Sequence, residues 1–162
     1  MNLGGSWDYI TSVAQGRLAH NKTSRHVSDY GDNIEVIGAA GELLARRYFG
    51  LEEKLHDGFD GGHDFLYAGK TVDVKATILT PQIQHRYLQW PTWKRIKAEI
   101  ILLTAVDPLT RQGIVIGWAT GDEILRAKIN NERSTPCYEI PIPALHPVYE
   151  LFAMAMKEAQ RW

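Results

Sequence analysis

Residues 63–79 read HDFLYAGKTVDVKATIL. Two runs with the alternating pattern of β-strands, 63–67 and 70–79, are separated there by Ala68-Gly69. A two-residue connection between such runs is typical of a tight β-hairpin, and its geometry determines which residues face each other. The stretch therefore predicts an antiparallel hairpin whose pairing begins directly beside the turn.

This hairpin would gather charged side chains on one face. In the register that the turn imposes, Phe65 pairs with Val72, and Asp64 lies directly across from Asp73. Because side chains alternate along a strand, Lys75 joins both aspartates on the same face. Like charges that face each other across strands are destabilising, by up to about 1 kcal/mol, so a fold that keeps them usually holds a cation between them. The pattern predicts a site for a metal ion and a phosphate.

Length and composition bound the class of protein. The 162 residues suffice for one domain with its own core, whereas two full domains would need a longer chain. The single cysteine, Cys137, excludes an internal disulfide framework and a zinc site built from several cysteines. The amino-terminal residues lack a basic start and an apolar stretch, and no segment approaches about 18 consecutive apolar residues. We therefore expect a soluble, cytoplasmic protein without a membrane span.

The charge is nearly balanced, with a net value of −1, so the surface as a whole is not expected to attract nucleic acid. Two local clusters are basic, one in a stretch without acids and one interleaved with aromatic residues. Both patterns suit contacts with phosphates, although they also fit solvated loops and aromatic core anchors. The expected nucleic-acid contacts are Arg17, Lys22 and Arg25 in the first cluster and Arg86, Lys94 and Arg95 in the second.

Two helices are predicted before the hairpin. Residues 6–18 have an apolar face and Ser6 as a possible cap, and residues 21–32 are polar enough to form a loop. Residues 33–48 carry a helical apolar stripe, with Gly50 as the expected stop. Two glycines inside this second helix, Gly38 and Gly41, would each cost roughly 1 kcal/mol against alanine, so they indicate that the helix lies close against a sheet.

Core strands are predicted after the hairpin at 99–106 and 113–119, joined by a turn at Asp107-Pro108. A helix is expected to begin at Thr120 or Gly121 and to run to Ile129. A proline-rich connection at 137–143 then leads to a last helix at 147–160. Residues 80–97 mix prolines, aromatics and bases, and they indicate only a short helix at 92–98.

The hairpin and its surroundings resemble the PD-(D/E)XK nuclease superfamily. Asp64 takes the place of the first motif aspartate, although His63 stands where the motif has its proline. Asp73, Val74 and Lys75 match the (D/E)XK half of the motif. An acid-x-Lys triplet alone is expected by chance roughly once in a chain of this composition. The position of this one within a predicted hairpin, with an acid on the preceding strand, is what makes the match specific.

Glu42 resembles the acidic residue that many members carry on the helix before the core hairpin. The resemblance covers residues 34–127, which follow an amino-terminal extension, 1–33, and precede a carboxyl-terminal part, 128–162. It implies a single α/β domain, residues 1–162, with a restriction-endonuclease-like core. That core would be a central mixed sheet of about four strands flanked by helices, with helical additions at both ends.

The resemblance implies a metal-dependent endonuclease that hydrolyses phosphodiester bonds. The expected catalytic residues are Asp64, Asp73, Lys75 and Glu42. Asp64, Asp73, Glu42 and the Val74 carbonyl would hold Mg²⁺, for which Mn²⁺ can substitute. Lys75 would position the attacking water and stabilise the negative charge that develops. DNA is the expected substrate, RNA is an alternative, and a homodimer is possible because small members often act as dimers.

Other interpretations remain open from the sequence. The same fold can serve as a catalytically weak module that binds nucleic acid or assists assembly, although such a module has no reason to keep opposed carboxylates beside a lysine. His56 and His63, with Asp57 and Asp60 nearby, could indicate zinc, but turn formation explains these residues better. A thiol nucleophile built from Cys137 and His146 lacks a recognisable activating context.

Overall fold

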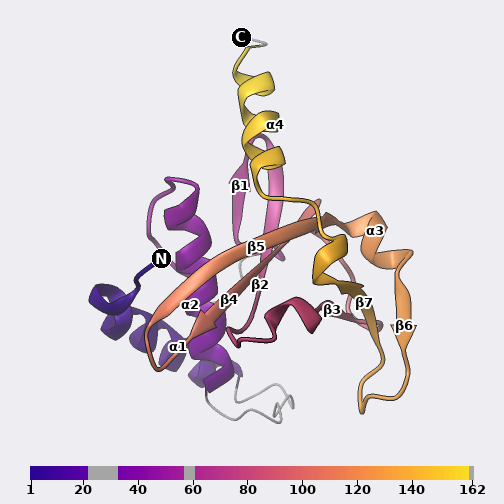
Figure 1. The fold of residues 1–162 in the computed structure, drawn as a ribbon. Helices are drawn as coiled ribbons and strands as arrows, with labels where there is room; N and C mark the ends of the chain where they lie inside the picture. The colour runs from indigo at the N-terminus through magenta and orange to yellow at the C-terminus, as the bar shows by residue number, and fades with distance from the viewer. Residues whose placement is uncertain (22–32, 57–60, 161–162) are drawn as a thin grey trace. The chain divides into compact units, whose positions relative to one another are not determined.

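The computed structural model describes residues 1–21, 33–56 and 61–160 (Figure 1). Within these ranges, no helix has both the length and the apolar composition needed to cross a membrane. The elements are, in chain order, η1 (Gly4–Ser6), α1 (Trp7–Asn21), α2 (Asn33–Tyr48), β1 (Phe65–Tyr67), β2 (Lys70–Ile78), η2 (Ile83–His85), β3 (Tyr87–Pro91), β4 (Ile100–Asp107), β5 (Gln112–Thr120), α3 (Gly121–Leu125), β6 (Lys128–Asn130), β7 (Cys137–Pro141), η3 (Ile142–Ala144) and α4 (Tyr149–Ala159).

The strands form two sheets, a larger one with the order β1-β2-β4-β5 and a smaller one with the order β3-β7-β6. In the larger sheet, β1 and β2 are antiparallel. Strands β2 and β4 run parallel, because Thr71 near the start of β2 bonds Glu99 just before β4, and Leu79 after β2 donates to the Val106 carbonyl near the end of β4. The chain is therefore α/β with a mixed four-stranded sheet flanked by helices, as predicted.

The turn of the predicted hairpin has the expected left-handed geometry. Both central residues have positive φ, 49° for Ala68 and 72° for Gly69, which matches the twist of the two strands that they join. Phe65 pairs with Val72, and Tyr67 pairs with Lys70, in the predicted register. Strand β1 begins at Phe65 rather than at His63, so the ladder is shorter than the sequence pattern indicated.

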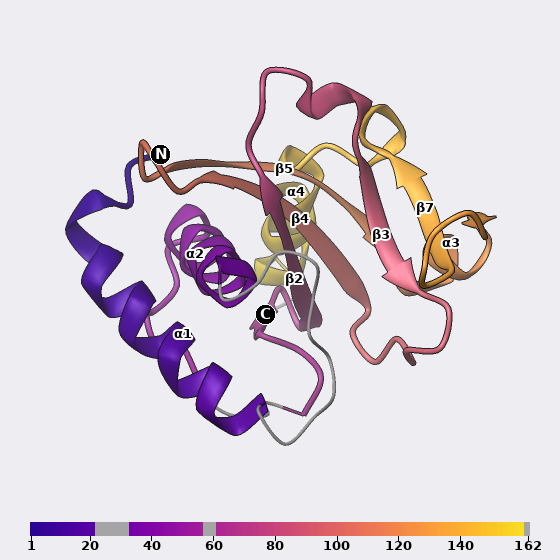
Figure 2. The ribbon, with the colours of Figure 1, turned by 90° about the horizontal axis from the view of Figure 1, so that it is seen from below.

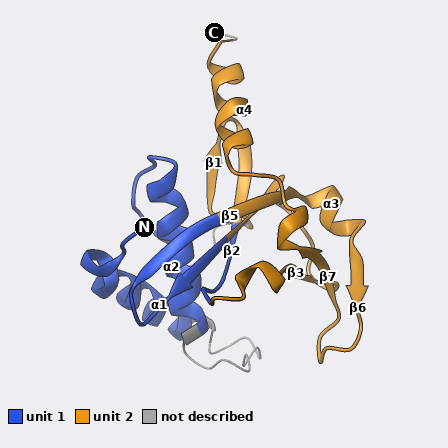
Figure 3. Ribbon diagram, viewed as in Figure 1, with its two compact units in different colours: residues 1–61, 74–80, 104–115 blue, residues 62–73, 81–103, 116–162 orange. Residues whose placement is uncertain are grey.

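The chain divides into two compact units, which are described separately below (Figure 3). The first unit comprises residues 1–61, 74–80 and 104–115. The second comprises residues 62–73, 81–103 and 116–162.

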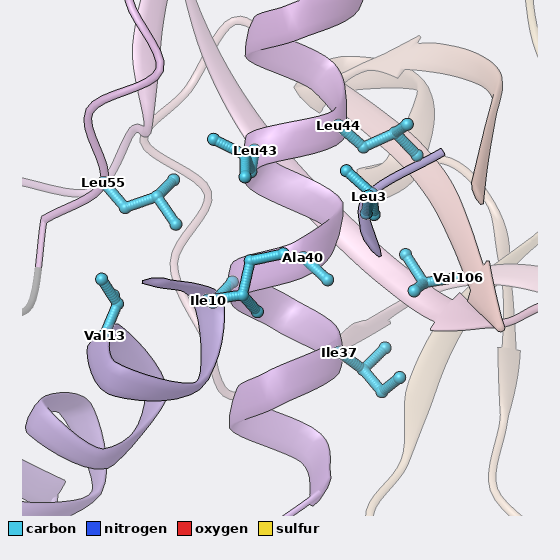
Figure 4. Packing of buried hydrophobic residues seen from close by; sticks show 10 residues of the cluster. Leu3, Ile10, Val13, Ile37, Ala40, Leu43, Leu44, Leu55 and Val106 are labelled. Atoms are coloured by element: carbon cyan, nitrogen blue, oxygen red, sulfur yellow. The ribbon is translucent and has the colours of Figure 1, made fainter. Parts of the chain in front are cut away.

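In the first unit, α1 lies beside α2, and the two helices enclose an apolar core (Figures 2 and 4). Ile10 from α1 and Leu43 and Leu44 from α2 are fully buried there, together with Leu3 and Val106. Burying a side chain of this size contributes roughly 1.5–3 kcal/mol, so this cluster is the main reason that α1 stays against α2. Helix α1 runs from Trp7 to Asn21, three residues past the end that the sequence predicted.

The end of α2 is set by local hydrogen bonds at Gly50, as predicted. Gly50 has a φ of 66°, its N–H donates to the Arg47 carbonyl, and the Leu51 N–H donates to the Arg46 carbonyl. This pair of bonds is the Schellman motif, in which a left-handed residue, usually glycine, closes the helix. Without these two bonds, the Arg46 and Arg47 carbonyls would be left to water, and this end of α2 would be free to fray.

Only one of the two glycines in α2 explains the close packing that the sequence predicted. A Cβ atom on Gly41 would overlap the Thr104 hydroxyl of β4 and the Cβ of Ala76 in β2. A Cβ atom on Gly38 would meet nothing within 4 Å. The sheet therefore approaches α2 most closely at Gly41.

The second unit contains the smaller sheet, which the sequence analysis missed. Residues 87–91 form β3, where Leu88 and Trp90 are buried against Ile101 and Leu103 of β4. No helix forms at 92–98, because the Trp90 indole N–H bonds the Lys94 carbonyl and Ile96 packs against the same core. The prediction of a helix there was wrong.

Two further predictions in this unit need correction. The helix expected to reach Ile129 ends at Leu125, and residues 128–130 form β6 instead. The proline-rich residues 137–141 form β7, whose pairing with both β3 and β6 outweighs the local signals. The predicted start of α3 is confirmed, because the Thr120 hydroxyl caps the Glu123 N–H while the Glu123 carboxylate accepts the Thr120 N–H.

The free edge of β5 is partly covered at both of its ends. In the first unit, Asn2 forms an isolated bridge with Gln112, and the Met1 and Gly113 backbones exchange two hydrogen bonds. In the second unit, Trp118 and His146 form another isolated bridge, again through two backbone bonds. These bridges tie the first residues of the chain and the segment before α4 to the larger sheet.

His146 also connects α3 to α4. Its Nε2 lies 2.7 Å from a Glu123 oxygen, its Nδ1 lies 3.4 Å from a Glu150 oxygen, and its ring stacks on Trp118. The hydrogen bond with Glu123 is the largest cause that raises the pKa of His146, and the charge of Glu150 adds to it. For Glu123, burial opposes ionisation, but the Thr120 backbone N–H and the His146 ring together lower its pKa.

We expect the contribution of His146 to stability to fall as the pH rises. The raised pKa means that the imidazolium is bound more favourably in the folded state, so its stabilisation is complete below the unfolded pKa of 6.5 and is lost as the pH passes the folded value. In denaturant titrations, the free energy of unfolding of the native chain should exceed that of His146→Gln at low pH, and the difference should shrink as the pH rises. The difference should be at most about 1 kcal/mol, because the interacting groups are partly exposed. A difference that grows with pH would contradict this assignment.

The close approach at Gly41 gives a second test. Gly41→Ala should lower the free energy of unfolding by about 2 kcal/mol, because the new methyl group overpacks the contact with Thr104 and Ala76. Gly38→Ala is the matched control in the same helix, and it should raise stability by roughly 0.5–1 kcal/mol through helix propensity alone. Equal effects of the two substitutions in urea unfolding would show that α2 does not pack against the sheet in this way.

Candidate functional site

The two aspartates of the motif belong to the second unit and lie at the start of the hairpin. Asp64 is the residue before β1, and its backbone N–H donates to the Val72 carbonyl over 2.8 Å. This bond holds Asp64 beside the peptide that joins Val72 to Asp73, one step past the last registered pair of the ladder. Asp64 lies outside the strand in which it was expected, so the predicted pairing directly across from Asp73 is not part of the observed ladder.

The two aspartates differ in how deeply they are buried. Asp73 is 8% exposed within β2, whereas Asp64 is half-buried. An ionised carboxylate removed from water to that extent is costly unless donors or a positive charge compensate it. The burial of Asp73 therefore requires compensating contacts in the fold.

Lys75 lies two residues after Asp73 in β2, so strand alternation places both on one face. Ala76, between Lys75 and the end of the strand, faces Gly41 of α2. Lys75 is consequently on the face of β2 that points away from α2. Its backbone carbonyl accepts the Thr104 hydroxyl at 3.3 Å, which fixes this part of β2 against β4. Val74 is half-buried and shares the face of Ala76.

Glu42 has a different set of partners from those expected of a metal ligand. It is 2% exposed, and its carboxylate lies 2.6 Å from a guanidinium nitrogen of Arg17 and 3.2 Å from Nε of Arg46. Arg17 also donates from Nε to the His56 carbonyl at 2.8 Å. The structure thus joins Glu42 and Arg17, which the sequence had assigned to the metal and to nucleic acid respectively. Because α2 covers the opposite face of β2, Glu42 and Lys75 are carried on opposite sides of the sheet in this unit.

Part of this cluster had a signal in the sequence. Glu42 and Arg46 are four residues apart, a spacing at which opposite charges on a helix meet. Arg17 is 25 residues from Glu42, and nothing in the local pattern indicated their contact.

The remaining basic residues are at the surface or outside the description. Arg86, Lys94 and Arg95 are exposed in the second unit, and the Lys94 ammonium lies 5.3 Å from the centre of the Trp90 ring. Trp90 itself is buried, so one aromatic of this cluster is a core anchor. Lys22 and Arg25 lie outside the described residues.

No group of three or more His, Cys, Asp or Glu side chains that could hold a metal ion is found in the described part of the chain. Asp57 and Asp60, which entered the zinc alternative with His56 and His63, lie outside that part. Magnesium keeps several water ligands and is often bound by one or two carboxylates. The pair Asp64 and Asp73 is therefore the arrangement that could hold Mg²⁺ here.

The thiol alternative finds no support in its surroundings. Burial is the largest cause that raises the pKa of Cys137, whereas a nucleophilic cysteine needs a lowered pKa. The thiol lies 3.4 Å from the Thr135 carbonyl, and His146 is engaged by Glu123 and Glu150. These contacts describe a structural cysteine.

Comparisons of the chain with models of known families, with curated proteins and with solved structures found no match. An assignment to the nuclease superfamily therefore rests on the motif residues and their geometry.

The ion pairs of Glu42 make a testable prediction about stability. Glu42→Gln should lower the free energy of unfolding by about 3 kcal/mol, because it removes the buried carboxylate charge that pairs with the buried guanidinium of Arg46. Glu53→Gln is the matched control, since Glu53 also pairs with an arginine of α2 but is exposed, and its loss should cost less than about 1 kcal/mol. Similar small losses in both variants would mean that Glu42 is not a structural anchor.

Proposed function

We propose that this chain is a metal-dependent nuclease that hydrolyses phosphodiester bonds, with DNA as its substrate. The observation that supports the proposal is the hydrogen bond from the Asp64 N–H to the carbonyl of Val72, the residue before the buried Asp73 in β2. Lys75 follows on the face of Asp73. Two acids and a lysine at one end of a hairpin are the groups that phosphodiester hydrolysis requires.

The proposed chemistry assigns one role to each group. Asp64 and Asp73, with the Val74 carbonyl, would bind Mg²⁺ or Mn²⁺, and the bound ion would supply charge neutralisation and an activated water for in-line attack on phosphorus. Lys75 would hold a water or a phosphate oxygen by hydrogen bonding and would stabilise the negative charge of the transition state.

The fold supports the same proposal at a coarser level. Helix α2 precedes the hairpin β1-β2, and the parallel placement of β4 beside β2 requires a crossover between them. A restriction-endonuclease-like core has this order of elements by the resemblance described above. The crossover here contains β3 of the smaller sheet, which the resemblance did not imply.

Glu42 has two competing roles in this proposal. As a metal ligand or a water-mediated neighbour of the ion, it would lower the Mg²⁺ concentration needed for activity. Its contacts with Arg17 and Arg46 favour the role of an anchor that positions Arg17. The Glu42→Gln variant separates the two, because a metal role changes the Mg²⁺ dependence of the rate and an anchor role changes stability.

The alternatives are a ribonuclease and a catalytically weak module that binds nucleic acid or assists assembly. The weak module predicts binding that is insensitive to the acidic residues, so it is tested by the same variants. A homodimer remains a prediction.

Asp73→Asn should abolish metal-dependent cleavage without unfolding the chain. Removing the buried carboxylate takes away a metal ligand, whereas the isosteric amide keeps the packing. Plasmid, linear duplex, single-stranded DNA and RNA would each be incubated with Mg²⁺, Mn²⁺ or EDTA, with Asp8→Asn in the first turn of α1 as the control. Lys75→Ala should slow cleavage far more than it weakens nucleic-acid binding.

Turnover by Asp73→Asn equal to that of the native chain would refute the assignment. Metal-independent binding that both variants retain, with no cleavage by the native chain of any of the four substrates, would favour the binding module instead.

A further inference from the structure

A cavity of about 430 Å³ lies in the second unit, and none of the residues proposed above for phosphodiester hydrolysis lines it. Its size falls within the range of roughly 300–1,000 Å³ that is typical of sites for small molecules. The apolar part of its wall comes from β4, β5, α3, α4 and the segment before β4, through Ile96, Ile100, Trp118, Leu125 and Met154. A wall of this kind favours an apolar or aromatic group.

One side of the rim carries a charge pair that is already satisfied. The Lys70 ammonium lies 2.7 Å from a Glu99 oxygen, and the second Glu99 oxygen accepts the Thr71 N–H at 3.2 Å. The hydrogen bond from Lys70 is the largest cause that lowers the pKa of Glu99, followed by the bond from Thr71. The charged form of Glu99 is therefore favoured, and its pairing with Lys70 leaves no net charge on this side of the rim.

Asp122 makes the rim acidic overall. It lies in the first turn of α3 and is exposed, and its backbone carbonyl accepts from Nε of Arg126. Among the described residues, its carboxylate has no hydrogen-bond or ion-pair partner. The charged groups that line the cavity thus comprise one ammonium and two carboxylates, which favours a ligand that brings a positive charge.

The backbone around the cavity is held in place before any ligand binds. The capping box between Thr120 and Glu123 fixes the start of α3, and the Gly121 N–H donates to the Glu99 carbonyl at 3.3 Å. A Cβ atom on Gly121 would come within 2.9 Å of Ile96, so the chain packs tightly at this side of the cavity. Met154 is flexible and polarisable, which lets the opposite side adapt to ligands of different shape.

We propose that this cavity binds a small organic amine in which an apolar or aromatic body is joined to a protonated nitrogen. The body occupies the space between Trp118, Leu125 and Met154, and the ammonium lies beside the Asp122 carboxylate. A ligand with a phosphate or carboxylate group is disfavoured, because it would face both Glu99 and Asp122. This inference is independent of the proposed nuclease activity.

The test uses three ligands with one ring and three charges: 2-phenylethylamine, 2-phenylethanol and 3-phenylpropionate. Each is titrated into the ¹⁵N-labelled full chain, and amide shifts are followed by NMR. The amine should bind about twofold to fivefold more tightly than the alcohol, which is the size expected for an exposed ion pair, and the carboxylate should bind most weakly. The largest shifts should fall on the residues that line the cavity, and added salt should reduce the advantage of the amine.

Two pairs of variants locate the interactions. Asp122→Asn should make the amine and the alcohol bind equally, whereas Asp8→Asn in the first unit should leave their ratio unchanged. Met154→Ala should lower the affinity for all three ligands. Met156→Ala should leave these affinities unchanged, because Met156 is on the same helix but outside the cavity lining. All four residues are exposed, so each variant is expected to fold.

Two results would overturn the proposal. One is equal binding of the three ligands, or an amine preference that survives in Asp122→Asn. The other is the absence of saturable shifts at the cavity, or shifts that persist unchanged in Met154→Ala. Loss of nuclease activity in any of these variants is not expected, so failure of this inference is distinguishable from failure of the proposed function.

Discussion

The close approach of α2 to the larger sheet at Gly41 is the constraint on which the first unit depends. Thr104 and Ala76 occupy the space in which any other residue would place its Cβ atom. With Gly41 in contact with the sheet, the neighbouring Glu42 pairs with Arg17 of α1 and with Arg46 of α2 itself. The same contact shows that α2 covers the face of β2 that carries Ala76. Because side chains alternate along a strand, Lys75 lies on the other face. One missing side chain thus determines the surroundings of two residues that the motif singles out.

Acidic residues of the motif are used in two physically different ways. Glu42 is compensated by guanidinium groups at hydrogen-bond distance, a setting in which further positive charge brings little gain. Asp64 precedes β1 and donates its N–H to the Val72 carbonyl, whereas Asp73 lies within β2 and is the more deeply buried of the two. The proposed metal site is centred on the hairpin, because Glu42 already has two guanidinium partners.

Local patterns predicted the structure well where local interactions determine it. The hairpin register, the bounds of α2 and the capping of α3 each depend on residues within a few positions of one another. The smaller sheet was missed because β3 and β7 pair across about 50 intervening residues, and prolines at the ends of both strands weaken their local signal. For the candidate site, the turn predicted the register from Tyr67 to Phe65, but not that Asp64 lies outside the ladder. The ion pair between Glu42 and Arg17 could not be predicted, because it depends on how two helices pack.

The two edges of the larger sheet differ in length, and both limit the access of foreign strands. Strand β1 has only three residues, so it offers few unpaired backbone groups. Strand β5 is longer, but isolated bridges from Asn2 and His146 occupy the two ends of its outer edge. An uncovered edge is a template for intermolecular β-pairing, which is how many sheets aggregate. Truncating the first residues of the chain would remove the Asn2 bridge and leave this end of β5 open to such pairing.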